Sequence, residues 1–186
     1  VINAGGAWID EVNAHLDENT NYIGGTKGSH IVLDHPALLA ALNGHELFFE
    51  NQDGRIVLLY PLDERVLVGT SDLPIDYFIE MIAHVFPDIP VNRDHIVYTF
   101  SGVRPLPATD AATPGQISRD HGIQINEADT ARPFPLLSLV GGKWTTYRAF
   151  AEQVTDEVLR RLDQPRICST TDWQIGGGHD YPANAI

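Results

Sequence analysis

The sequence predicts a mixed fold of the α/β and α+β classes, and two observations lead to that prediction. Between Glu46 and Asp72, short apolar runs alternate with tight polar turns, which is typical of an antiparallel meander. Two other segments, Val1–Asp10 and Leu136–Leu162, each carry an apolar strand through Gly-Gly into a helical pattern, which is typical of α/β units. We therefore expect an antiparallel sheet with its own helix, and a strand–turn–helix part formed by the two Gly-Gly segments.

Composition narrows the class of protein. The 186 residues are 43% hydrophobic and 20% charged, which is ordinary for a globular protein. A formal charge of -13 argues against nucleic-acid binding, because no Lys/Arg stripe offsets phosphate repulsion. The single Cys168 excludes an internal disulfide and fits a reducing compartment. No apolar run approaches the ~20 residues that span a bilayer. Because the chain opens inside a predicted strand, we expect it to be part of a longer protein.

The segment Leu136–Leu162 is the strongest candidate for a binding site. Its strand runs into Gly141-Gly142-Lys143, and the first N–H groups of the following helix should point outward and favour an anion. The alternative is that Gly-Gly is only a packing turn; the lysine and the two threonines favour a site. Apolar residues at helical spacing should face the core, namely Phe150, Ala151, Val154, Val158 and Leu162.

Tyr22–Leu33 predicts a glycine-bearing loop and a strand, with Lys27, Ser29 and His30 at the strand entrance. His30 is either a site residue or a satisfied surface or core histidine. In the meander, an Asn-Gln-Asp-Gly turn at 51–54 indicates a hairpin, and Thr70 near the end of the last strand either reaches a ligand or caps the next segment. Tyr77–Phe86 predicts an amphipathic helix that Pro87 ends.

Two arginines are candidates for anion binding. Arg104 lies between Gly102 and Pro105, and the proline restricts the backbone so that the guanidinium is aimed. Arg119 stands beside Asp120, and each arginine could instead form a surface ion pair. We expect strands near 95–101 and 116–126 to join the meander sheet. The Gly triplet at 176–178 follows no strand and precedes no helix, which argues against a phosphate loop.

Six motifs, in order, resemble those of FAD-dependent glycerol-3-phosphate dehydrogenases, whose fold is shared with D-amino-acid and glycine oxidases. They are VINAGGAW at Val1–Trp8, TKGSHI at Thr26–Ile31, RIV through GTSD at Arg55–Asp72, SGVRPL at Ser101–Leu106, ISRD at Ile117–Asp120 and SLVGGKWTTYR at Ser138–Arg148. Three departures stand out. The G-x-G-x-x-G unit and most of a C-terminal helical region are absent from these residues, and 73–76 is shorter than the family's loop, either as a deletion or as a junction of two segments.

The resemblance implies part of an FAD-binding Rossmann-like domain together with an antiparallel substrate domain, as in D-amino-acid oxidase. Residues 1–20 and 136–162 would belong to the FAD domain, 21–135 to the substrate domain, and 163–186 to a linker. FAD would contact Ala4, Gly5, Gly141, Gly142, Lys143, Trp144 and Thr145. Without the G-x-G-x-x-G unit, residues 1–186 alone should not hold FAD tightly.

The resemblance also implies oxidation of sn-glycerol 3-phosphate to dihydroxyacetone phosphate in glycerol metabolism, with electrons passed to quinone. Arg104 and Arg119 would bind the phosphate, with Thr70 and Lys143 beside the substrate. His30 is the candidate base, and Lys143 would stabilise charge on the reduced flavin. The catalytic set is therefore His30, Arg104, Arg119 and Lys143, with no metal. Arg104 and Lys143 should converge on one pocket.

Two alternatives remain at this point. One is an α-glycerophosphate oxidase that passes electrons to oxygen, which these residues do not distinguish from the dehydrogenase. The other, from a different class, is a non-enzymatic stand-alone binding module, which the missing G-x-G-x-x-G favours if the chain is complete. The expected location is cytoplasmic, with the parent enzyme a peripheral protein at the cytoplasmic face of the membrane.

Overall fold

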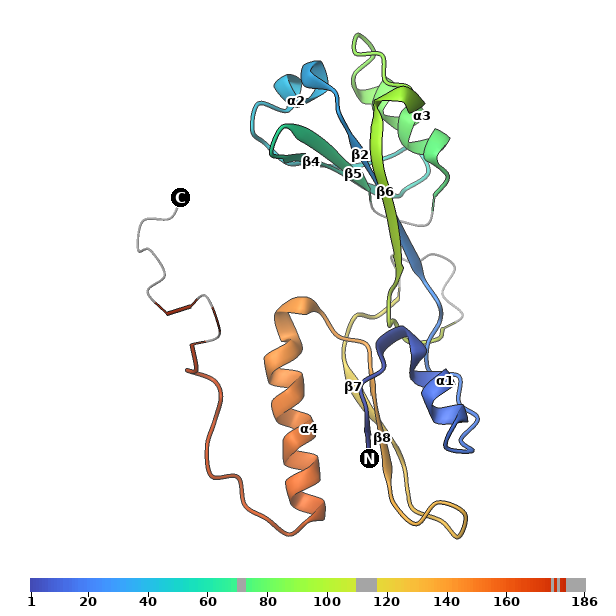
Figure 1. Cartoon of the computed structure of the whole chain (residues 1–186), viewed down its shortest axis with the longest axis vertical. Helices are drawn as coiled ribbons and strands as arrows, with labels where there is room; N and C mark the ends of the chain where they lie inside the picture. The colour runs from blue at the N-terminus through green and yellow to red at the C-terminus, as the bar shows by residue number, and fades with distance from the viewer. Residues whose placement is uncertain (70–72, 110–116, 175, 177, 180–186) are drawn as a thin grey trace. The chain divides into compact units, whose positions relative to one another are not determined.

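The computed structural model describes residues 1–69, 73–109, 117–174, 176 and 178–179 (Figure 1). The chain forms two compact units. One comprises Gly5–Ser118, and the other comprises Val1–Ala4 with Arg119–Ile186. We call them the middle unit and the outer unit and describe each by itself. The assignment of segments bounded at residues 20, 135 and 162 to an FAD domain, a substrate domain and a linker stays a prediction.

The middle unit contains a five-stranded antiparallel sheet with strand order β3-β4-β5-β2-β6. Its strands are β2 (Lys27–Leu33), β3 (Leu47–Glu50), β4 (Ile56–Leu62), β5 (Arg65–Gly69) and β6 (Ile96–Val103). The predicted meander corresponds to β3, β4 and β5, which pair in sequence as hairpins. Strands β2 and β6, more distant in sequence, add to the β5 edge, so that β2 lies between β5 and β6.

Helices α2 (Pro36–Leu42) and α3 (Ile75–Val85) pack on one face of this sheet (Figure 1). The core is apolar: α2 contributes Leu38 and Leu42, α3 contributes Phe78, Met81 and Ile82, and the alternating strand residues facing them include Ile31, Leu33, Val57, Leu59, Val66 and Val68. The helix predicted at 77–86 is confirmed as α3. The unit also contains the short 3-10 turns at Gly6–Trp8 and Arg93–His95, and α1 (Ile9–Ala14).

The outer unit contains a three-stranded sheet of order β1-β8-β7. Strand β1 (Ile2–Asn3) is parallel to β8 (Leu136–Val140), and β7 (Gly122–Asn126) is antiparallel to β8. The prediction that the strand near 116–126 joins the meander sheet is therefore wrong. A hairpin connection of nine residues brings β7 to its sequence neighbour β8, and the guanidinium of buried Arg132 fastens that connection by donating to the carbonyls of Asn126, Glu127 and Phe134.

Helix α4 (Tyr147–Arg161) follows β8 after one 3-10 turn, Trp144–Thr146. It buries Phe150 and Val154, as predicted. Ala151 and Leu162, predicted on the same buried face, are exposed. Residue 162 lies beyond the last α-helical turn, where the 3.6-residue periodicity no longer sets the direction of the side chain.

Candidate functional site

His30 lies on β2, the strand between β5 and β6 in the five-stranded sheet. Its register partners are Gly69 on one side and Phe100 on the other. The imidazole stacks on the Phe100 ring with centroids 4.7 Å apart and planes 7° apart. A Cβ on Gly69 would stand 2.1 Å from His30 Cδ2, so only glycine leaves room for the ring. The strand register therefore holds the imidazole in a slot between Gly69, which has no side chain, and the Phe100 ring.

Arg104 follows β6 and reaches back over β2. A Cβ on Gly28 would stand 2.6 Å from Arg104 Nη2, and Nη1 donates to the Lys27 carbonyl at 3.4 Å. The Arg104 backbone N–H donates to the Thr26 carbonyl at 2.7 Å, which fixes the residue at its Cα. The guanidinium therefore lies against Gly28 on β2, two residues before His30.

The environment of His30 disfavours its protonated form. Burial first, and then the positive charge of Arg104, lower the pKa of His30 below its ordinary value of 6.5. Its Nδ1 atom is buried and has no hydrogen-bond partner among the described residues. At neutral pH the ring is therefore a neutral imidazole with an unused nitrogen, which is the protonation state that a general base requires.

A cavity of about 380 Å³ lies between the sheet and α3 within the middle unit. Its polar lining comes from β2 and β6, and its apolar lining comes mainly from the start of α3. The lining residues are Lys27, Ser29, His30, Ile31, Leu73, Pro74, Ile75, Phe78, Thr99, Phe100 and Ser101. The volume lies within the range of small-molecule sites. Because successive side chains of a strand face opposite sides of a sheet, Lys27, Ser29 and Ile31 place this cavity on the α3 side, and the His30 ring faces the other side.

In the outer unit, the Gly-Gly turn at the end of β8 has a clear steric cause. Gly141 has φ +78°, and a Cβ there would stand 2.3 Å from the Asp120 carbonyl oxygen. The group that packs against this glycine is thus the backbone carbonyl of Asp120, the residue after Arg119. His121 continues the contact: its ring stacks on Phe150 with centroids 4.4 Å apart, and its Nε2–H donates to Gln153 Oε1 at 3.0 Å. The packing explanation therefore holds for Gly141.

Gly142 and the residues after it are more open. Gly142 has φ +103°, and the nearest atom to an added Cβ would be His121 Cβ at 3.5 Å. Lys143 and Thr145 are exposed, and the Trp144 side chain is 90% exposed. The Lys143 N–H, expected to be free for an anion, instead donates to Thr146 Oγ1 at 3.1 Å because a 3-10 turn precedes α4. The exposed ammonium, indole and hydroxyl remain as the donors of this turn.

The structure brings the predicted residues together in two groups. His30 and Arg104 are neighbours in the middle unit, and Arg119 lies exposed, directly before the Asp120 contact with the Gly-Gly turn of the outer unit. Ala4 and Gly5 follow β1, whose parallel pairing with β8 puts both strand ends at one sheet edge. Thr70 lies outside the described residues. Convergence of Arg104 with Lys143 stays a prediction.

Sequence reasoning missed four residues that shape these groups: Gly28, Gly69, Phe100 and His121. Each acts across a strand pairing or a turn contact. Gly28 and Gly69 stand within the motifs already singled out, so their presence was visible. Their purpose was hidden because it depends on which residue lies opposite, and register is a tertiary property.

Comparisons with known proteins agree on one family. The model described as FAD dependent oxidoreductase (DAO) matches residues 1–148. A glycerol-3-phosphate dehydrogenase of Synechocystis is 37% identical over 208 aligned residues, covering 98% of this chain and 36% of the relative. An aerobic glycerol-3-phosphate dehydrogenase of Staphylococcus haemolyticus is 33% identical, covering 96% and 34%.

Among solved structures, the glycerol-3-phosphate dehydrogenase of Bacillus halodurans complexed with FAD superimposes with a TM-score of 0.67 at 25% identity. The match covers 91% of this chain and 34% of that protein. The chain thus spans about a third of the length of the relatives it matches. Among the described residues, no helix is long and apolar enough to cross a membrane.

Proposed function

Since this chain belongs to the family of FAD dependent oxidoreductases, we propose that it supplies the substrate-facing sheet and the Gly-Gly-Lys turn of a glycerol-3-phosphate dehydrogenase. The reaction is the oxidation of sn-glycerol 3-phosphate to dihydroxyacetone phosphate. The names of the relatives support the substrate, and one observation of this chain carries the proposal. That observation is the pairing of an aimed guanidinium, Arg104, with a neutral imidazole, His30, on one sheet surface.

The two groups suit the two ends of this substrate. A phosphate dianion is bound best by the planar donor fork of an arginine, and Arg104 is fixed at its backbone by Thr26. Arg119, exposed at the start of the β7 hairpin, is the second phosphate ligand in this proposal, and Thr70 a further substrate contact. At the other end, His30 accepts the proton of the C2 hydroxyl, because its lowered pKa keeps it neutral at pH 7.

The outer unit fits the cofactor of the family at residues 142–145. The ammonium of Lys143, the indole N–H of Trp144 and the hydroxyl of Thr145 are exposed donors on one turn, and a Cβ added at Gly142 would meet no atom closer than 3.5 Å. We assign these residues, with Ala4, Gly5 and Gly141, to holding the flavin. Bound FAD would supply the acceptor for the hydride from C2. The Lys143 ammonium would stabilise negative charge on a group bound beside it.

We further propose quinone as the final electron acceptor and the cytoplasmic face of the membrane as the site of action. The three relatives reported above are all named dehydrogenases and none is named an oxidase, which supports an acceptor other than oxygen. An oxygen-electrode assay with and without a quinone analogue separates this proposal from a glycerophosphate oxidase. Turnover of any kind by the flavin-loaded protein contradicts a purely binding role.

Replacement of Arg104 tests the phosphate assignment. In the complete flavin-loaded parent enzyme, Arg104→Ala should lower kcat/KM for glycerol 3-phosphate by about two to four decades, since truncating one partner of a buried charge pair costs about 2–5 kcal/mol. Arg104→Lys should recover little, because an ammonium lacks the planar fork. With unphosphorylated glycerol, the same variants should stay within about threefold of the unaltered protein.

Arg93→Ala is the matched control. Arg93 lies in the same unit, exposed and paired with Asp76 through two hydrogen bonds of 2.9 and 2.8 Å. It should leave turnover of both substrates unchanged. A loss on Arg104→Ala that is equal for glycerol and glycerol 3-phosphate would mean that Arg104 supports the fold rather than the phosphate.

A further inference from the structure

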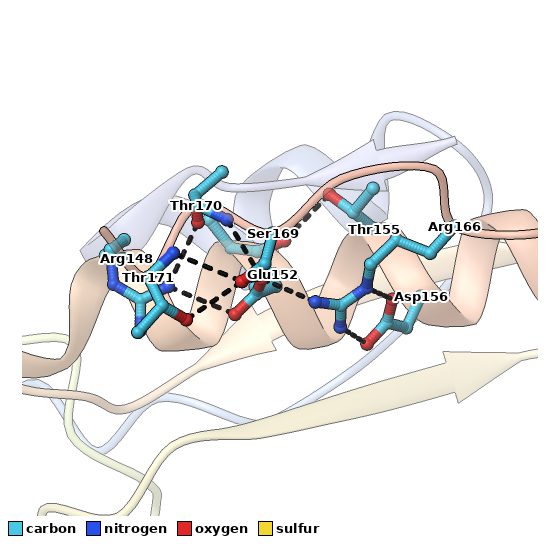
Figure 2. Close-up of polar contacts among 9 residues, drawn as sticks. Arg148, Glu152, Thr155, Asp156, Arg166, Ser169, Thr170 and Thr171 are labelled. Atoms are coloured by element: carbon cyan, nitrogen blue, oxygen red, sulfur yellow. Dashed lines mark hydrogen bonds and ion pairs between the residues drawn. The ribbon is translucent and has the colours of Figure 1, made fainter. Parts of the chain in front are cut away.

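The segment Gln164–Thr171, which we call the strap, runs back along helix α4 after the helix ends (Figure 2). Its fastening centres on Glu152, in the middle of the helix. The Glu152 carboxylate accepts from Arg148 Nη1 at 3.0 Å, from Ser169 Oγ at 3.0 Å and from the Thr170 N–H at 3.3 Å. Arg166 Nη1 donates to the same carboxylate. One carboxylate thus joins the helix to three residues of the strap.

A second carboxylate completes the fastening. The Arg166 guanidinium also donates to Asp156, with Nε to Oδ1 at 2.7 Å and Nη2 to Oδ2. Glu152 and Asp156 are four residues apart and so lie on one helix face, where a single arginine can reach both. Arg148 in turn donates to Thr170 Oγ1 at 3.0 Å, so the strap is held from both sides of Glu152 (Figure 2).

Apolar packing contributes little to this attachment. Within the strap, Ile167 is 92% exposed and Cys168 is exposed, and Trp173 beyond it is 62% exposed. A groove of about 750 Å³ remains between the strap and the helix. Groove-lining side chains on the helix include Tyr147, Ala151 and Leu159. Ile167 and Cys168 also line this groove but stay exposed, so the strap gains little hydrophobic stabilisation from lying where it does.

We propose that the strap is an electrostatic latch: the charges of Glu152, Asp156 and Arg166 hold it on α4, and loss of those contacts lifts it from the helix. The arrangement suits a reversible device, because exposed ion pairs are individually weak and are screened by salt. Hydrogen bonds from Arg148 and then from the Thr170 N–H lower the pKa of Glu152, so the latch stays charged at neutral pH. The proposal is independent of the oxidoreductase function.

The sole cysteine of the chain makes the latch measurable without further substitution. A nitroxide attached to Cys168 in the 186-residue chain reports strap mobility by electron paramagnetic resonance. Glu152→Gln should increase the mobile fraction of the label by about fivefold or more, because it removes the charge but keeps the side-chain shape. Glu157→Gln is the matched control: it makes the same change of charge on the same helix, where Glu157 pairs with Arg160 and Arg161, and should leave the label unchanged.

Salt gives a second, mutation-free arm. Raising the ionic strength from about 0.05 M to about 1 M should release the label in the unaltered chain and have little effect once Glu152→Gln is in place. Circular dichroism checks that each variant is folded; if Glu152→Gln unfolds, the salt series decides. A label that is equally immobile in Glu152→Gln and Glu157→Gln, or that ignores salt, overturns the latch and assigns the strap to apolar packing.

Discussion

Gly69→Ala is the perturbation that tests the slot around His30 most directly. The added Cβ would stand 2.1 Å from His30 Cδ2 and 2.7 Å from Cγ, whereas two carbons rest about 3.5–4.0 Å apart. The imidazole would have to move by about 1.5 Å. It has no free direction across the sheet, because Phe100 stacks on it at 4.7 Å. The ring must therefore leave the slot.

The expected cost follows from these contacts. Overpacking of a filled site costs about 1–3 kcal/mol, and a lost aromatic stack about 0.5–1.5 kcal/mol, so the middle unit should lose about 2–4 kcal/mol of its free energy of unfolding. Gly102→Ala is the control in the same sheet, because an added Cβ there meets nothing within 4 Å. Its effect should stay within about 0.5 kcal/mol.

Two measurements check this prediction. Urea unfolding followed by circular dichroism gives the free energies, and NMR titration of the imidazole gives the pKa of His30. Burial and Arg104 hold that pKa below 6.5, so a ring displaced into solvent should titrate closer to 6.5 in Gly69→Ala. Equal stability of Gly69→Ala and Gly102→Ala, with an unshifted His30 pKa, would refute the slot.

Three further predictions concern the outer unit. Hydrogen bonds from Arg160 and then Arg161 lower the pKa of Glu157 from 4.5 to about 2. The stability that this carboxylate contributes is therefore present above pH 4.5 and is lost as the pH falls toward 2, so Glu157→Gln should flatten the acid side of a plot of the free energy of urea unfolding against pH. An unchanged acid side would count against the pairing. Gly141→Ala meets both a positive φ and the Asp120 carbonyl and should cost about 2–5 kcal/mol, against about 1–2 kcal/mol for Gly142→Ala; equal losses in urea unfolding would contradict the close approach. In the flavin-loaded protein, Lys143→Ala should lower kcat more than it raises KM and should lower the flavin reduction potential, whereas a change in KM alone would make Lys143 a substrate ligand only.

The local elements could be predicted from the sequence because their signals are local. Period-two apolar runs with an Asp-Gly turn predicted β3, β4 and β5, and the 3.6-residue period predicted α3 and most of α4. Gly102 and Pro105 predicted that the Arg104 backbone is restricted, whereas its contacts with Lys27 and Gly28 on β2 came only from the structure. In each case, the residues that decide the conformation lie within a few positions of one another.

The partners of these elements depended on the tertiary structure. The sequence indicated that a strand lies near residues 116–126, but its pairing with β8 instead of the meander depended on the hairpin that Arg132 fastens. Gly141 was a predicted ligand contact, and the structure shows that its missing Cβ accommodates the Asp120 carbonyl.

The same division applies to the candidate site. The sequence alone indicated His30, Arg104 and Lys143 as candidates, because charge, ordinary pKa and donor geometry belong to the residue type. Only the structure showed that Gly69 and Phe100 enclose the His30 ring and that Gly28 admits the Arg104 guanidinium. Those choices follow from strand register, which is set when the whole sheet buries its apolar face and which a one-residue shift would reverse.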